Sequence, residues 1–584
     1  MNILGMSAFY HDSSCSLLRD GELICAASEE RFSRIKHDHG LPSKAFRFCL
    51  ERAGVEIGDI DCVSYYEDPK AKLSRQLWMR LSSAGPPKFD LVPQIQKSRV
   101  EQTIRYFLGY EGPIQFVEHH QAHAASAYYF SGFEHAAIMT VDGVGEWATA
   151  SYGRGRGSEL ELFEEVHFPH SLGLLYSTLT SYLGFEVNDG EYKVMGLAPY
   201  GEPRFVDEIR KLVRPGDEGQ FQLDLNYFDF FGGERMYSER LQELLGQPPR
   251  EPETEFHSFH FDVARSLQCV LEEILLQKVR YLHSQVPDEN LCLAGGVALN
   301  CVANSRILRD GPFKRLFVQP AAGDAGGALG AAALAHVKRT GCGITPRVLN
   351  HVYLGPEYSV NGIARLLEVA PDVAYDFRNQ EERLLEAVVQ RLAQGKVIGW
   401  FHGPMEFGPR ALGGRSILAD PRIRTMRDRI NLLVKKRESF RPFAPTVLAD
   451  CAAEHFALDH PSPFMLEIAQ VRSKIDLPAI THVDGSARVQ TVDGDSNPRF
   501  YRLLQSFNRA TGCPILLNTS FNLRGEPIVC SPVDAICCFI QAKLDTLVME
   551  DFLIDQERVP ARWRELAPRP HPQKSLVHEV YTLL

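Results

Sequence analysis

Two histidines in the first quarter of the chain are spaced so that they could bind one metal ion. His119 and His123, in EHHQAHAASAYYF, are four residues apart and therefore lie on the same side of a helix. Such a pair is also a common accident, so packing or hydrogen bonding by the two rings is an equally good interpretation of the pair alone. Asp142, in VDGVGE, and Asp324, in AAGDAGGALG, could add carboxylates from loops. Two imidazoles with carboxylates form a mixed nitrogen and oxygen set, which suits iron, manganese or zinc.

Basic residues in the second half of the chain could bind anions. They are Arg410 and Arg415 in FGPRALGGRS, Lys435, Lys436, Arg437 and Arg441 in INLLVKKRESFRPFAP, and Arg488 in GSARVQTV. Several stand beside glycines, prolines and apolar residues, where a buried cation needs an anion because isolated charge is costly to bury. The phosphates of a nucleotide would supply it. The alternative, a solvated basic face with surface ion pairs, fits poorly with the mostly apolar FRPFAP.

Two further polar groups are candidates for a reaction site. In PILLNTSFNLRGEPIV an apolar strand runs into Asn518 and Ser520, whose side chains can hydrogen-bond phosphate oxygens, although strand-capping turns use the same residue types. His11, in FYHDSS, has the residue type of a general base, although a lone histidine in a loop is more often structural. Neither a GxxxxGK[ST] phosphate loop nor a GxSxG serine motif is present in the sequence.

These residues must be positioned by strands, turns and helices that the sequence also predicts. Residues 2–9 read as a strand, and residues 15–32 read as a hairpin that turns at Asp20-Gly21. A helix follows, with Ser43 placed to cap it and Gly54 to end it. The stretch AAIMTVDGVGEWATASYGRG again sets an apolar strand before a turn with Asp and Gly, which predicts a duplicated phosphate-cleft fold.

Glycine-rich segments follow two buried strands in the middle of the chain. NLCLAGGVALN and RLFVQPAAGDAGGALGAAALAHVKR each read as a strand, a loop and a helix, and such loops aim backbone N–H groups at an anion. Glycines and prolines between Gly341 and Pro356 then predict a domain boundary near residue 355. Beyond it, EERLLEAVVQRLAQGKVIGWF reads as a helix followed by a strand.

Length and composition set the outer limits. A chain of 584 residues exceeds the size of one hydrophobic core, and 44% hydrophobic with 23% charged residues is typical of a globular protein. The net charge of −11 argues against wholesale binding to nucleic acid. Thirteen cysteines without a CxxC pair favour reduced thiols and a cytoplasmic location. We expect no membrane segment, because no apolar run reaches the roughly 18 residues of a span.

Taken together, the segments resemble the O-carbamoyltransferases of antibiotic, toxin and nodulation-factor biosynthesis, such as the nebramycin and tobramycin carbamoyltransferases. The resemblance runs nearly the whole chain and rests on an ordered set of motifs: YHDSSCSL, EERFSRIKHD, EHHQAHAASAYYFSG, VDGVGE, KVMGLAPYG, AGGVALN, GDAGGALGAA, GPRALGGRSIL, RESFRPFAP, ARVQTV and NTSFNLRGEPIV.

The resemblance implies an α/β protein with two catalytic domains. Residues 1–355 would form a metal-binding domain with the duplicated actin-like ATPase (ASKHA) fold, in which the carbamoyl group is transferred. Residues 356–584 would form a YrdC-like α/β domain that makes carbamoyl-adenylate from carbamoyl phosphate and ATP, with Mg²⁺ accompanying the nucleotide.

The resemblance also implies roles for individual residues. Arg410, Lys435, Arg441 and Arg488, with Asn518 and Ser520, would hold ATP and carbamoyl phosphate. His119, His123, Asp142 and Asp324 match the family's Fe²⁺-binding positions. His11 matches the proposed base, Lys36 matches a residue lining the acceptor site, and Gly295, Gly296 and Gly326 would shape loops around the nucleotide.

The expected activity is therefore ATP-dependent O-carbamoylation of a small-molecule hydroxyl, with neither nucleic acid nor membrane as a partner. The acceptor stays open, and so does the oligomeric state, for which a homodimer is one option. Three alternatives remain: a tRNA threonylcarbamoyl transferase, a metal-dependent hydrolase built on the H-x3-H pair, and a non-catalytic nucleotide switch of the actin-like type.

Overall fold

A computed structural model of the chain describes residues 1–82, 99–229, 235–345, 348–435 and 440–566. The described residues form two compact units. The first unit holds Met1–Glu29 and Asp38–Leu349, and the second holds Glu30–His37 together with the described chain from Asn350 onward. None of the described helices is long and apolar enough to cross a membrane.

The first unit is built on two five-stranded sheets. One sheet has the strand order β3 (Glu22–Ser28), β2 (Ser14–Arg19), β1 (Asn2–Ser7), β4 (Cys62–Tyr65), β5 (Ile114–Phe116). The other has the order β12 (Arg315–Val318), β11 (Asn290–Ala294), β6 (His135–Val141), β7 (Ala148–Arg156), β8 (Glu159–His167).

The two sheets repeat one topology. In each, the first strand along the chain lies in the middle, with an antiparallel strand on one side that is followed by a second antiparallel strand. On its other side lie two parallel strands. The repeat expected from the two strand-and-turn segments is therefore present in the sheets, and the α/β class is confirmed.

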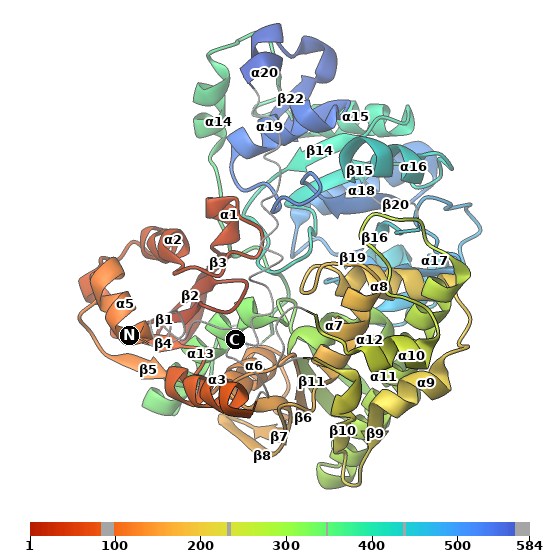
Figure 1. Cartoon of the computed structure of the whole chain (residues 1–584). Coiled ribbons are helices and arrows are strands. Elements are labelled where there is room, and N and C mark those ends of the chain that lie inside the picture. The colour runs from red at the N-terminus through yellow and green to blue at the C-terminus, as the bar shows by residue number, and fades with distance from the viewer. Residues whose placement is uncertain (83–98, 230–234, 346–347, 436–439, 567–584) are drawn as a thin grey trace. The chain divides into compact units, whose positions relative to one another are not determined.

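Two helices join the sheets and carry three of the four candidate metal ligands. Helix α13 (Asp324–Thr340) packs on β1, β2 and β4, while α6 (His119–Tyr128) packs on β6, β7 and β11. The helices also pack on each other (Figure 1). They approach closely because their contact surfaces are small: a Cβ on Gly330 would lie 1.8 Å from the carbonyl oxygen of Ala122. The run of Gly and Ala in α13 thus sets the distance between the two helices.

The local predictions for the opening segment hold with one exception. Asp20 and Gly21 both have positive φ, as the tight turn of this hairpin requires, and Gly54 ends helix α2 (Ser43–Ala53) in the left-handed conformation. Ser43, however, does not cap α2 with its side chain. The Glu29 carboxylate instead accepts the N–H groups of Lys44 and Ala45, so the cap comes from the end of β3.

The other helices of the first unit surround these layers. The longest, α11 (Ser258–Gln285), packs on α7, α8, α9 and α12. Besides α11 they are α3 (Pro69–Ser82), α5 (Val100–Leu108), α7 (Leu172–Tyr182), α8 (Glu191–Leu197), α9 (Val206–Leu212), α10 (Glu239–Leu245) and α12 (Cys301–Asp310); a small sheet pairs β9 (Val213–Pro215) with β10 (Phe221–Leu223).

The second unit is built on one mixed eight-stranded sheet. Its order is β13 (Tyr375–Asp376), β22 (Phe552–Asp555), β21 (Thr546–Met549), β14 (Ile398–Phe401), β15 (Arg415–Ala419), β20 (Ile515–Ser520), β16 (Ala444–Leu448), β19 (Gln490–Val492). Its helices are α1 (Glu30–Ser33), α14 (Val360–Leu367), α15 (Glu381–Ala393), α16 (Met426–Ile430), α17 (Ala452–His455), α18 (Pro498–Thr511), α19 (Pro532–Ala542) and α20 (Ala561–Leu566); β17 (Ile468–Gln470) pairs with β18 (Ser486–Arg488).

Candidate active site

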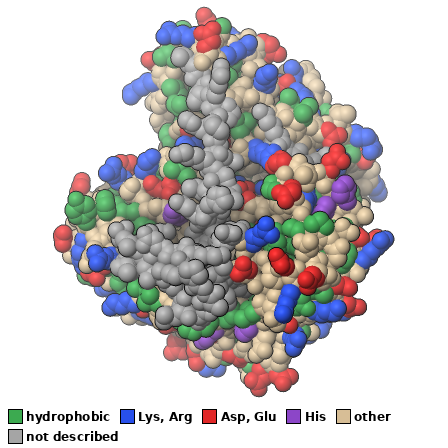
Figure 2. Space-filling view, in the orientation of Figure 1, with side chains coloured by type: hydrophobic (Ala, Val, Ile, Leu, Met, Phe, Trp, Pro, Cys, Tyr) green, Lys and Arg blue, Asp and Glu red, His purple; other side chains and the backbone are tan. Residues whose placement is uncertain are grey.

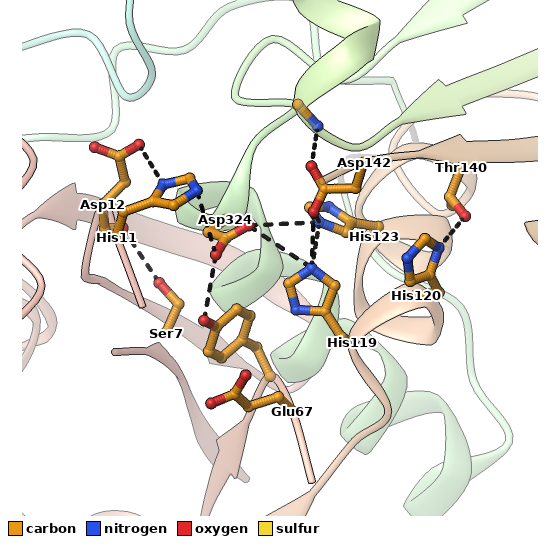
Figure 3. Close-up of polar contacts among 12 residues, drawn as sticks. Ser7, His11, Asp12, Glu67, His119, His120, His123, Thr140, Asp142 and Asp324 are labelled. Carbon is orange, nitrogen blue, oxygen red and sulfur yellow. Dashed lines mark hydrogen bonds and ion pairs between the residues drawn. The ribbon is translucent and has the colours of Figure 1, made fainter. Parts of the chain in front are cut away.

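Four ligand-type side chains face one point in the first unit. One ligand atom from each of His119, His123, Asp142 and Asp324 lies within 4.8 Å of the other three, and all four residues are buried. Figure 3 shows the two imidazoles and the two carboxylates turned toward one another. The structure thus brings together the four residues that the sequence singled out.

Helix α6 supplies the two histidines, and the end of β6 and the start of α13 supply one carboxylate each. His119 and His123 lie one turn apart on α6, so their Nε2 atoms are 3.0 Å from each other. Asp142 directly follows β6, and its Oδ2 lies 3.1 Å from His119 Nε2 and 3.4 Å from His123 Nε2. Asp324 is the first residue of α13 rather than part of a loop, and its Oδ1 lies 3.7 Å from each of the two Nε2 atoms.

The donor set fits a divalent metal ion. Oδ1 of Asp324 is buried and has no hydrogen-bond partner among the described residues, although it faces two ring nitrogens. Two nitrogens bound about 2.1 Å from one metal lie roughly 3.0–3.4 Å apart, which matches the spacing of His119 and His123. A cation would also neutralise two carboxylates that are otherwise buried beside each other.

Hydrogen bonds and charges within the cluster shift the pKa values of its own side chains. Burial alone would raise the pKa of Asp142, but hydrogen bonds from His119 and His123 hold it well below the usual range. Burial would lower the pKa of His119, but Asp324 and Asp142 raise it to about 9. A metal would therefore compete with a proton for the His119 ring, since both need its lone pair.

Glycines predicted around the nucleotide stand beside Asp142. The N–H of Gly296 donates to Asp142 Oδ1 over 2.7 Å, which leaves Oδ2 facing the histidines. Gly295 has a φ of 92°, and a Cβ there would lie 2.3 Å from the carbonyl oxygen of Val141. Gly326 differs from the expectation because it lies inside α13 rather than in a loop; a Cβ there would lie 2.1 Å from Ala321 O.

Glu146, which sequence reasoning missed, holds the start of α6. Its carboxylate accepts the N–H of His119 at 3.0 Å and the N–H of Asp68 at 2.6 Å. Burial raises the pKa of Glu146 to about 6. A carboxylate at this position favours the helix start because the first N–H groups of a helix lack intrahelical partners. The spacing Asp142-x3-Glu146 after an apolar strand was the available signal.

His11 lies beside the cluster, next to Asp324. Its Nδ1 is 3.0 Å from Asp12 Oδ2, and its Nε2 is 4.0 Å from Asp324 Oδ2 (Figure 3). Burial would lower the pKa of His11, but Asp324 and Asp12 raise it to about 9. His120, between the two candidate ligands, turns away from the cluster and pairs with Thr140 over 2.6 Å.

The strand register of the second unit brings its candidate residues to one edge of the sheet. Phe401 pairs with Arg415, Ser416 with Ser520, Ala444 with Asn518 and Thr446 with Gln490. The ends of β14 and β20 and the starts of β15, β16 and β19 therefore meet. Arg410 lies in the β14–β15 connection, Arg441 three residues before β16, Arg488 two residues before β19, and Ser520 at the end of β20.

The environments of these residues differ. Arg410, Arg441 and Arg488 are half-buried. Asn518 is buried, and its side-chain amide donates to Ala411 O over 3.2 Å and to Gln490 Oε1 over 2.9 Å. Ser520 Oγ donates to Asn522 Oδ1 over 2.8 Å.

One candidate, Lys435, is only partly described, and another, Lys36, belongs to a different unit than expected. Lys435 ends the π-helical turn Asn431–Lys435, and its side chain lies outside the described part of the structure, as do Lys436 and Arg437. Lys36 belongs to the segment Glu30–His37, which groups with the second unit and not with the first. Arg34 of this segment donates to the carbonyl oxygens of Pro527 and Ile528.

A histidine–carboxylate pair at the same edge was also missed. His402 Nδ1 lies 2.6 Å from Glu550 Oε2, and Glu550 Oε1 accepts the N–H of Gly403. Glu550 belongs to this edge because the preceding residue, Met549, pairs with Phe401. Hydrogen bonds from His402 and Gly403, with the charge of Arg499, lower the pKa of Glu550 against the effect of burial. The partners are 148 positions apart in sequence, which left no local signal.

Comparison with known proteins gives the family. Residues 2–333 match the model "Carbamoyltransferase N-terminus" and residues 389–556 match "Carbamoyltransferase C-terminus". An uncharacterized protein of Synechocystis sp. is 44% identical over 97% of this chain and 99% of its own length. Nodulation protein NolNO of Sinorhizobium fredii is 41% identical over 98% of this chain and 83% of its own.

A third relative carries a named reaction. The 3'-hydroxymethylcephem-O-carbamoyltransferase of Amycolatopsis lactamdurans is 29% identical over 89% of this chain and 92% of its own length. Apart from Glu30–His37, the residues that match the N-terminal model belong to the first unit, which carries the four-residue cluster, and those that match the C-terminal model belong to the second unit, which carries the basic sheet edge. The chain therefore belongs to the O-carbamoyltransferase family and is a carbamoyl-transferring enzyme.

Proposed function

We propose that this enzyme forms carbamoyl-adenylate from carbamoyl phosphate and ATP at the sheet edge of its second unit and transfers the carbamoyl group to a hydroxyl of a small natural product at the four-residue cluster of its first unit. The main support for this proposal is that four ligand-type side chains meet at one buried point: His119, His123, Asp142 and Asp324. The named cephem relative supports a hydroxyl acceptor.

Cations at the sheet edge suit the first half of the reaction. Carbamoyl phosphate is hydrolysed to carbamate and phosphate; a carbamate oxygen then attacks the α-phosphorus of ATP, and the bond to pyrophosphate breaks. Attack joins two anions, so fixed cations lower the barrier as charge builds on pyrophosphate. We assign that role to Arg410, Lys435, Arg441 and Arg488, and Mg²⁺ arrives with ATP. Ser520 would donate to a phosphate oxygen in place of Asn522, and Asn518, whose amide N–H groups donate to Ala411 and Gln490, would line the same site.

The cluster suits the second half. His119, His123, Asp142 and Asp324 would hold Fe²⁺, or Mn²⁺ or Zn²⁺ in its place. When bound, the metal supplies a Lewis acid for the phosphate and acyl oxygens of the adenylate.

His11 is the proposed base for the acceptor. It takes the proton from the acceptor hydroxyl, whose oxygen attacks the carbamoyl carbon, and AMP leaves with the electron pair of the broken acyl–oxygen bond. Asp324 contributes to the raised pKa of His11, so a cation bound at Asp324 favours the neutral imidazole that a base requires. We place Lys36 at the acceptor and Gly295, Gly296 and Gly326 around the nucleotide moiety.

We also propose a fold for each part of the chain and a cellular compartment for the enzyme. The repeated sheet topology of the first unit supports the duplicated actin-like ATPase (ASKHA) fold for residues 1–355, and we assign a YrdC-like fold to residues 356–584. All thirteen cysteines lie in the described part of the chain and none forms a disulfide there, which supports a reducing compartment such as the cytoplasm.

Two variants test whether adenylate formation and carbamoyl transfer take place at separate sites. Arg441→Ala should abolish carbamoyl-adenylate formation, yet the variant should still transfer from synthetic carbamoyl-adenylate. His119→Ala should lose metal and transfer while it still makes the adenylate. Mass spectrometry of adenylate and product reports both steps, and Arg424→Ala, at an exposed arginine, is the control. Loss of both activities in both variants would contradict separate sites.

A further inference from the structure

A tyrosine hydroxyl contacts the cluster at Oδ2 of Asp324, whereas Oδ1 is the oxygen of this carboxylate that faces the histidines. Tyr66 is fully buried and follows β4 directly. Its hydroxyl donates to Asp324 Oδ2 over 3.3 Å. Oδ1 of the same carboxylate faces the Nε2 atoms of His119 and His123 at 3.7 Å each and accepts no hydrogen bond from a described residue. The two oxygens of Asp324 thus have separate surroundings.

The Tyr66 ring is held in place from three directions. Its backbone N–H donates to Met6 O over 3.1 Å, which continues the pairing of β4 with β1. The ring meets Tyr65 edge-on at 5.4 Å and lies 5.2 Å from the ring of His119. On α13, Gly327 leaves room for it, because a Cβ at that position would lie 2.7 Å from Tyr66 Cδ2. These contacts hold the ring where its hydroxyl reaches Asp324.

A carboxylate without such a donor could rotate about its Cβ–Cγ bond. The alternative partner for Asp324 Oδ2 is His11, whose Nε2 lies 4.0 Å away. The hydrogen bond from Tyr66 to Oδ2 keeps Oδ1 directed at the histidines. It also leaves the His11 ring available for its proposed role as base. Partners of this kind orient ligating carboxylates, and their removal weakens metal binding about 10- to 100-fold.

We infer that Tyr66 is a positioning residue for the metal centre: its hydroxyl fixes Asp324 so that Oδ1, and not Oδ2, is presented to the ion held with His119, His123 and Asp142. This role rests on the proposed function, because it requires that the four residues bind a metal.

Metal affinity tests the inference without reference to turnover. Metal-free full-length protein is titrated with Co²⁺, whose visible absorption bands report both affinity and ligand geometry. Tyr66→Phe should bind Co²⁺ about 10- to 100-fold more weakly than the wild type and with altered band intensities. The matched control is Tyr65→Phe, which removes the neighbouring buried hydroxyl that donates to Ala8 O and should leave Co²⁺ binding unchanged.

A second variant guards against a folding defect. Gly327→Ala keeps the hydroxyl but displaces the Tyr66 ring, and alanine is a better helix former than glycine, so α13 stays intact. We expect it also to weaken Co²⁺ binding. Wild-type affinity in Tyr66→Phe would overturn the positioning role alone. Failure of the wild type to bind Co²⁺ would overturn the metal assignment, and the positioning role with it.

Discussion

Arg415 and Arg441 have the same charge but lie in different environments. Arg441 is half-buried just before β16, whereas Arg415 is fully buried on β15. The Arg415 guanidinium donates to the carbonyl oxygens of His402, Gly403, Gly414 and Pro356 and stacks 3.6 Å from the centre of the Phe401 ring. The fold itself uses this cation, because four carbonyl groups take the place of an anion. Basic residue type alone predicted both arginines as anion ligands and could not separate them.

Replacement of Arg415 by methionine should destabilise the second unit. The change removes the arginine donor from all four carbonyl oxygens, of which those of Gly414 and Pro356 keep a backbone N–H, so we expect a loss of about 3 kcal/mol in the free energy of unfolding. Urea unfolding followed by tryptophan fluorescence measures it, since Trp400 lies on the neighbouring strand. Arg424→Met, at a side chain that is 79% exposed, should change the free energy by less than about 0.5 kcal/mol. Equal losses would contradict a structural role for Arg415.

Sequence reasoning found the ligand-type residues but missed their supports. The spacing of His119 and His123 fixes their common helix face, and Asp142 follows a strand that its apolar run makes visible. Tyr66 contacts a partner 258 residues away in sequence, so no local pattern marks it, and the one signal for Glu146, its spacing from Asp142, does not point to its contact with His119, 27 residues away. Surface charge does not mark the site either: Figure 2 shows acidic and basic side chains interspersed over the described surface in view.

Elements with strong apolar runs were predicted well, and their ends less so. Strands β6 and β11 and helix α13 stand where the sequence indicates, because burial on both faces demands continuous apolar or small residues. The start of α2 was misjudged because its cap is the distant Glu29 and not the adjacent serine. A single propensity at a helix end cannot anticipate a carboxylate delivered by another strand.

Helix α11 contains a buried lysine that makes stability depend on pH. Lys278 donates to Gly219 O over 3.0 Å and lies over the rings of Tyr152 and Phe221. Burial lowers the pKa of Lys278 to about 7, far below its value in the unfolded chain. Between these two values the unfolded state binds more protons, so the free energy of unfolding should rise with pH, by roughly 1 kcal/mol per unit between about pH 7 and 10.

The variant Lys278→Met removes this titration. Urea unfolding at pH 7.5 and pH 9.5 should show a smaller rise in the free energy of unfolding for Lys278→Met than for the wild type. Lys211→Met, at an exposed lysine of α9, should keep the full wild-type rise. An unchanged pH dependence in Lys278→Met would show that this side chain is charged in the folded protein.

At the scale of the whole molecule, the repeated topology of the first unit explains why its sites could be anticipated in part. Each repeat ends its central strand at a polar turn, so His11 and Asp142 follow β1 and β6, respectively. The assignment of Glu30–His37 to the second unit was not visible in the sequence, because hydrogen bonds to Pro527 and Ile528 arise only in the folded chain.

The proposed reaction requires this enzyme to activate carbamate as an AMP ester. The most direct measurement incubates the purified full-length enzyme with ATP and carbamoyl phosphate, without an acceptor, and follows carbamoyl-adenylate by mass spectrometry together with the release of pyrophosphate. We predict that the adenylate accumulates and that pyrophosphate appears only when carbamoyl phosphate is present. Carbamoylation of an acceptor without ATP, or cleavage of ATP to ADP in place of pyrophosphate release, would exclude carbamoyl-adenylate as the intermediate.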